Sequence, residues 1–214
     1  MNPALPADWR WVGLVLAVAV LGWAVRRLPW HKVHGDAEAQ RIFGIFIAVV
    51  ICLRVLNTQS VMGINLHFLG ASIAALMFGA RFALVALAAV SAAWAVLGRV
   101  WLGWGWDFLA NDALPVAVTM AFGGLLNRTL PPHLFIYIIG NAFFAAFLAM
   151  LASVLAKGAM THALGGEAMP YFIAAIPMSF GEAFFTGGTM ALVVAYRPQW
   201  CATFDDARYL GKRD

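Results

Sequence analysis

The chain has 214 residues, of which 63% are hydrophobic and 11% charged, and its mean hydropathy is +0.83. Because a soluble domain of this size carries about half apolar and a quarter charged residues, a soluble globular fold is excluded. The two cysteines exclude a disulfide-built scaffold. The small number of basic residues in the C-terminal tail, without interleaved aromatic residues, argues against nucleic-acid binding. These observations predict an all-α, polytopic integral membrane protein with a single transmembrane domain over 1–214.

Seven apolar stretches are candidate transmembrane helices. Since about 20 apolar residues span the hydrocarbon core, a chain of this length and composition allows about six or seven crossings. The stretches cover 9–25, 42–56, 66–80, 82–98, 108–126, 134–156 and 171–196. A short cytoplasmic tail is predicted over 197–214.

The basic residues predict the orientation of these helices. The loop after the first stretch is strongly positive, and such loops stay in the cytoplasm, so we expect the N-terminus outside. Ten of the 14 basic residues then lie on the inner side. They are Arg26, Arg27, Lys32, Arg41, Arg81, Arg128, Arg197, Arg208, Lys212 and Arg213. An even number of crossings would move the basic tail outside, so the charges favour seven helices and a cytoplasmic C-terminus.

Ionisable side chains within apolar stretches mark candidate functional sites, because they are costly in a bilayer. Four such residues and two polar neighbours lie in the outer half or the middle of the predicted membrane region. They are Arg54, His67, Asp112 and Glu182, with Asn65 and Asn111 beside them.

Two of these residues indicate a metal site. A neutral imidazole is a common ligand of nickel, cobalt, copper and zinc, although His67 could instead only hydrogen-bond a neighbouring helix. Pro115 cannot donate the hydrogen bond that the Asn111 carbonyl would accept, which predicts a kinked, partly unwound helix. A kink whose carbonyl is satisfied by water is the alternative. The candidate metal ligands are His67, Asn111, Asn65 and Asp112.

The last apolar stretch contains a second candidate feature. Met178 and Glu182 lie four residues apart on one helical face, and Glu182 is expected near the bilayer centre. Its carboxylate could bind a cation or carry a proton on a translocation path. Alternatively, an Arg54–Glu182 ion pair would make both residues structural, and Asp112 is a second possible partner for Arg54.

Motifs of known chemistry are missing from the sequence. It contains no phosphate-binding loop, no His-Glu-x-x-His and no Gly-x-Ser-x-Gly. We therefore predict that the chain is not an enzyme and that any ATP-driven step uses another polypeptide. The tryptophan-rich run from Trp101 to Trp106 is either an interfacial anchor or a cap over an outer site.

Three parts of the chain resemble the cobalt and nickel capture subunits of energy-coupling-factor transporters. The first is Asn-Leu-His-Phe-Leu-Gly from Asn65, followed by an alanine-rich helix ending Met-Phe-Gly-Ala at Ala80. The others are the surroundings of Asn111, and those of Glu182 before a last helix ending Tyr-Arg-Pro. The resemblance covers nearly the whole chain.

This resemblance implies a seven-helix subunit of the bacterial inner membrane with its N-terminus outside. Such a subunit takes a transition-metal cation as substrate from the outer side and has no intrinsic cofactor. It depends on a coupling membrane subunit and on cytoplasmic ATPases for energy.

The N-terminus departs from the family pattern. In the family, the terminal amine and a histidine at position two hold the metal together with a histidine that matches His67. This chain begins Met1-Asn2-Pro3, so position two has no imidazole and position three no N–H. A non-transporting accessory or assembly subunit of a larger membrane complex is therefore an alternative. A weaker alternative is capture of a small organic molecule beneath the tryptophan-rich run.

Overall fold

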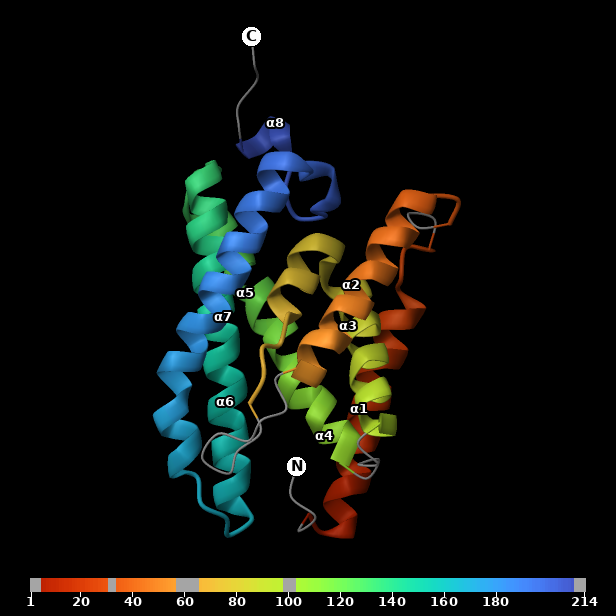
Figure 1. Cartoon of the computed structure of the whole chain (residues 1–214), viewed down its shortest axis with the longest axis vertical. Helices are drawn as coiled ribbons and strands as arrows, with labels where there is room; N and C mark the ends of the chain where they lie inside the picture. The colour runs from red at the N-terminus through yellow and green to blue at the C-terminus, as the bar shows by residue number, and fades with distance from the viewer. Residues whose placement is uncertain (1–4, 31–33, 57–65, 98–102, 210–214) are drawn as a thin grey trace.

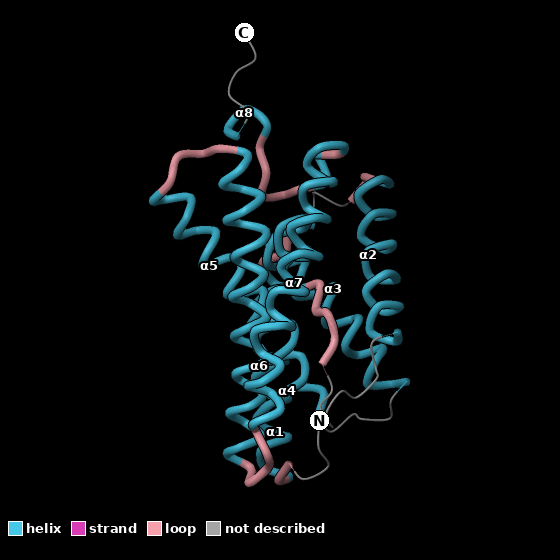
Figure 2. The backbone as a smooth tube through the Cα atoms, turned by 60° about the vertical axis from the view of Figure 1, so that its left-hand side comes forward, coloured by secondary structure: helices cyan, strands magenta, loops and turns pink. Residues whose placement is uncertain are grey.

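The computed structural model of the chain describes residues 5–30, 34–56, 66–97 and 103–209. Figure 1 shows α6 and α7 along one side of the molecule and α1 and α2 along the other, with α3 and α4 between them. All the regular structure in the described ranges is helical (Figure 2). The predicted all-α class is therefore confirmed.

The described residues form eleven helical segments. In chain order they are α1 (Ala7–Arg26), α2 (Ala37–Leu56), α3 (Ala71–Leu97), α4 (Trp104–Phe108), η3 (Leu109–Ala113), α5 (Leu114–Thr129), η4 (Ile136–Phe144), α6 (Ala145–Ala163), α7 (Met169–Tyr196), η5 (Pro198–Trp200) and α8 (Asp206–Tyr209). The segments η3 and η4 are π-helical turns within longer helices.

Five segments of the described residues are long and apolar enough to cross a membrane. They are α1, α3, the continuous helix Trp104–Thr129, the continuous helix Ile136–Ala163, and α7. The chain is thus a multi-pass membrane protein. The count of seven crossings and the orientation of the termini stay predictions.

The prediction of one continuous helix over the third stretch, 66–80, is wrong. Residues 66–70 are non-helical, and α3 begins only at Ala71, after Gly70 with φ 64°. Gly79 then breaks α3 with φ 77° and ψ 162°, a conformation that favours glycine. The first arm of α3, residues 71–78, is about 12 Å long, which is too short to cross a hydrocarbon core of about 30 Å.

The C-terminal residues 197–209 pack against one end of the bundle (Figure 1). The backbone N–H groups of Ala202 and Thr203 donate to the carbonyls of Met77 and Leu76, at 2.8 and 3.3 Å. These carbonyls lie near the end of the first arm of α3, just before the break at Gly79.

Candidate metal-binding site

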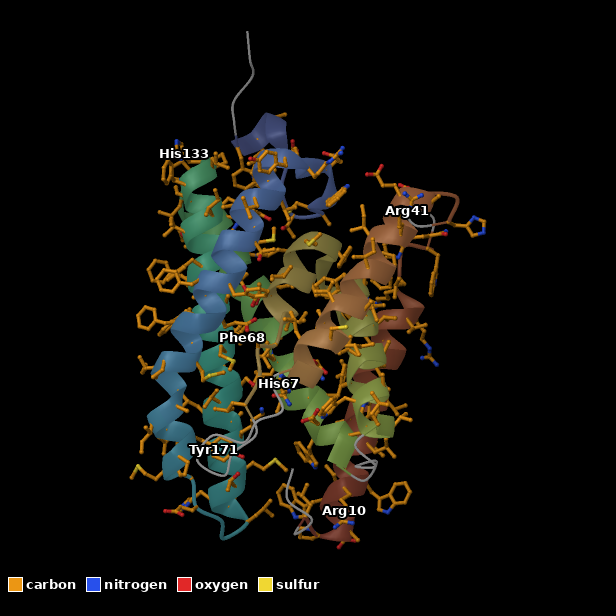
Figure 3. All side chains as sticks on the ribbon, viewed as in Figure 1. Arg10, Arg41, His67, Phe68, His133 and Tyr171 are labelled. Atoms are coloured by element: carbon orange, nitrogen blue, oxygen red, sulfur yellow. The ribbon has the colours of Figure 1, made fainter. Side chains whose placement is uncertain are left out.

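The extended stretch 66–70 brings His67 into the middle of the bundle (Figure 3). The stretch 66–70 is held in place by contacts with α7. Phe68 packs on Phe185 with ring centroids 5.9 Å apart. A Cβ at Gly181 would stand 3.0 Å from the Phe68 ring, which would have to shift by a few tenths of an ångström to accommodate it.

Glu182 of α7 also holds this stretch, through hydrogen bonds to its backbone. It is 1% exposed, and its carboxylate accepts the N–H of Leu69 at 2.9 Å and the N–H of Gly70 at 3.0 Å. These donors lie at the start of α3, where the helix dipole favours a negative charge. The N-terminus of α3 therefore compensates the buried carboxylate, and no arginine is needed.

Arg54 pairs with Asp112 and not with Glu182. Both side chains are 0% exposed, and Arg54 Nη2 donates to Asp112 Oδ1. Of the two partners considered from the sequence, the second is the one observed. Arg54 Nε and Nη1 and Asp112 Oδ2 have no hydrogen-bond partner among the described residues. The pair thus keeps polar atoms that can still bind water or a ligand.

Asn111 lies on the π-helical turn beside this pair. It is 1% exposed, its Nδ2 donates to Asp107 Oδ1 at 2.7 Å, and its Oδ1 has no partner among the described residues. An acceptor that is buried without a donor is costly, which makes it a candidate ligand for a cation.

The helix that carries Asn111 is not unwound, contrary to the expectation from Pro115. Leu109 and Leu114 have α-helical dihedral angles, and the N–H of Leu114 donates five residues back to Leu109. The π-helical turn and the proline at the start of α5 let the helix continue although Pro115 lacks an N–H group.

His67 is half-buried, and its Nδ1 lies 3.1 Å from the carbonyl oxygen of Phe68. The tautomer protonated at Nδ1 donates to this carbonyl and leaves the Nε2 lone pair available to a metal. Arg54, Lys157 and Asp107 are the charged groups that act electrostatically on the imidazole.

Asp107 and Lys157 were missed by the sequence analysis. Asp107 is four residues before Asn111, a spacing that brings side chains together on a helix and could have been noticed. Lys157 fell just beyond the stretch predicted to end at residue 156. No signal in the sequence places it near His67.

Two further predicted site residues are Met178 and Asn65. Met178 is half-buried and packs against the apolar core. Asn65 falls outside the described residues, as do residues 1–4. Within the described ranges, no three His, Cys, Asp or Glu residues are grouped so that they could hold a metal ion.

A separate cavity of about 740 Å³ lies between α1, the π-helical turn and α6. Its lining includes Trp9, Trp106 and Met160 and none of the polar cluster described above. Trp101 and Leu102 lie outside the described residues, so the predicted cap is not described either.

The chain thus combines a helical membrane fold with a buried polar cluster. The chain matches, over residues 1–200, the family model CbiM, the cobalt uptake substrate-specific transmembrane region. The chain belongs to this family and is a transmembrane component of cobalt uptake, which confirms the resemblance seen in the sequence. No curated protein matches the chain.

Proposed function

We propose that the chain captures a transition-metal cation of the cobalt or nickel class from the outer side of the membrane. Release to the cytoplasm depends on a coupling membrane subunit and on ATPases. The family match supports the general role. The observation that carries the proposed site is His67, whose Nδ1 is within hydrogen-bond distance of a carbonyl so that Nε2 is free for the metal.

The proposed ligands are His67 Nε2 and the unpaired Oδ1 of Asn111, completed by Asn65 and by Asp112 Oδ2. The carboxylate of Asp112 is compensated by Arg54. Cations such as Mg²⁺ and Ca²⁺ prefer several carboxylate oxygens, whereas imidazole nitrogen suits cobalt and nickel. The donor set therefore favours a transition metal.

In this proposal Glu182 is a positioning residue. Its carboxylate holds the N–H groups of Leu69 and Gly70, and so the segment that carries His67. Movement of this segment would break two charge-assisted hydrogen bonds, each worth about 1.5–3 kcal/mol. Such a cost is consistent with release driven by partner subunits.

Metal titration of the purified full-length protein tests the site. We expect His67→Ala to weaken binding of Co²⁺ or Ni²⁺ at least about tenfold, since it removes the nitrogen ligand. His162→Ala is the matched control, because His162 is exposed in the last turn of α6 and should leave affinity unchanged. Equal metal affinity of the wild type and His67→Ala would contradict the proposed site.

The energy dependence has a separate test. Metal uptake into vesicles should require the ATPases and the coupling subunit together with this chain. Uptake by this chain alone at the same rate would contradict the dependence. An accessory subunit, the alternative, would bind no metal at His67 and would still co-purify with a larger membrane complex.

A further inference from the structure

A lateral groove of about 650 Å³ runs between α1, α3 and α5. The side chains that line it are apolar, apart from the indole N–H of Trp23. Representative lining residues are Ala19 and Trp23 of α1, Ala80 and Leu84 of α3, and Ala117 and Met120 of α5. The outer surface of α1 is also apolar, with Val15, Val18 and Val25 exposed. In a membrane such a groove opens toward lipid tails and not toward water.

Arginines gather at one end of this groove. Arg81 directly follows Ala80, its Nη1 donates to the Arg27 carbonyl at 2.6 Å, and its guanidinium lies 6.0 Å from the Trp23 ring centroid. Arg26 and Arg27 are exposed beside it. No described carboxylate pairs with these three arginines, so their charge is not compensated within the described chain.

A phosphate group matches the chemistry of this end. A guanidinium binds phosphate oxygens through parallel N–H donors, and Arg81 uses only one nitrogen for the Arg27 carbonyl. The tryptophan between the arginines and the apolar walls is typical of the boundary between headgroups and tails.

The length of the groove matches one leaflet. On the wall formed by η3 and α5, the lining residues extend from Leu109 to Met120. This stretch is about 16 Å long at 1.5 Å per residue. Half of a hydrocarbon core is about 15 Å. An acyl chain that starts at the arginines would therefore fill the groove and end near the bilayer centre.

We propose that this groove binds one anionic phospholipid, with an acyl chain between α1, α3 and α5 and its phosphate on Arg81 and Arg27. The lipid fills the space between the second half of α1 and α5. It thereby fixes α1 against the bundle. The groove shares no residue with the proposed metal site, although its lining residues Leu109 and Ala113 lie on the same π-helical turn as Asn111 and Asp112.

Native mass spectrometry of the full chain in detergent tests the proposal with phosphatidylglycerol as the probe. The wild type should retain one lipid. Arg81→Gln, which removes one phosphate contact, and Ala117→Phe, which fills the groove, should each lower the affinity about fivefold or more. Arg128→Gln removes an exposed arginine at the end of α5 and should bind as the wild type does.

Thermal unfolding separates the possible sources of the effect. Phosphatidylglycerol should raise the Tm of the wild type more than phosphatidylcholine does, and inorganic phosphate alone should not raise it, because the groove contributes to binding. Unchanged lipid retention in both Arg81→Gln and Ala117→Phe would overturn the proposal. An equal rise in Tm with inorganic phosphate would overturn the role of the groove. Wild-type Co²⁺ affinity in the variants would show that they are folded.

Discussion

Each buried charge in the described part of this bundle has its own local compensation. Arg54 and Asp112 neutralise one another at 0% exposure, and Glu182 is stabilised by the N-terminus of α3. A lone charge would cost far more than either arrangement, because the surroundings offer little solvation. A single substitution at one of these positions therefore lowers the stability of the fold, because the remaining charged or polar partner stays buried without compensation.

Asp112→Asn is predicted to destabilise the protein by about 3–5 kcal/mol, because it leaves the Arg54 guanidinium buried without a countercharge. Chemical or thermal unfolding in detergent measures this loss. The double variant Arg54→Met/Asp112→Leu removes both charges and should recover most of the stability. If the loss in the double variant equals the sum of the losses in Arg54→Met alone and Asp112→Leu alone, the pair does not act as a unit.

At the scale of elements, glycines decide how closely the helices approach. Gly13 of α1 and Gly105 of α4 face each other, and a Cβ at Gly13 would come within 2.5 Å of the Trp106 ring. Trp106 also donates its Nε1–H to the Trp9 carbonyl at 2.6 Å. Close contact between α1 and α4 therefore depends on the absence of side chains at both glycines.

Gly105→Ala is predicted to destabilise the protein by about 1–3 kcal/mol through overpacking, because its Cβ would stand 2.5 Å from the Leu14 backbone nitrogen. Gly22→Ala is the matched control, since nothing lies within 4 Å of a Cβ there. It should be neutral or stabilise by about 0.4–1 kcal/mol through the lower entropy of the unfolded chain. Equal unfolding temperatures for the two variants would contradict the close contact.

For the whole molecule, the C-terminal residues and α7 together hold the first arm of α3 at its two ends. Glu182 binds its start, while Thr203 Oγ1 donates to the Leu76 carbonyl at 2.9 Å near its other end. Tyr137 packs edge-on against Phe204, with centroids 4.9 Å apart. The short arm, which is broken from the rest of α3 at Gly79, depends on both contacts for its position.

Cys201 reports whether this C-terminal packing is intact. Burial raises the pKa of its thiol to about 11, so at pH 8 only about one molecule in a thousand carries the reactive thiolate. In a Cys52→Ser background, maleimide labelling of Cys201 at pH 8 should be at least tenfold slower than after unfolding. Thr203→Ala should accelerate it by loosening the segment. Labelling at the rate of a free thiol would contradict the packing.

The same pKa predicts a pH effect on stability. The folded state holds this proton more tightly than the unfolded state, whose thiol has a pKa of about 8.5. The contribution of this thiol to the free energy of unfolding is therefore complete below about pH 8.5, and it is lost as the pH rises toward 11. Unfolding measured between pH 7 and 10 should show the decline, and Cys201→Ala should remove that part of it.

Most of the helical segments could be predicted from apolar length alone. The stretches at 9–25, 42–56, 108–126, 134–156 and 171–196 each fall on one continuous helical segment. The start of α3 could not be predicted, because Leu66–Gly70 is as apolar as a helix. Its extended form depends on Glu182, more than 100 residues later in the chain.

The sequence by itself determined that the chain is a helical membrane protein, which polar residues are costly inside it, and to which family it is similar. These follow from composition and local pattern, which act along the chain. Only the tertiary structure decided that Arg54 pairs with Asp112 and that Glu182 caps α3. Both depend on contacts between residues far apart in the chain, whereas the contact between Asp107 and Asn111 is local to one helix and follows from their four-residue spacing.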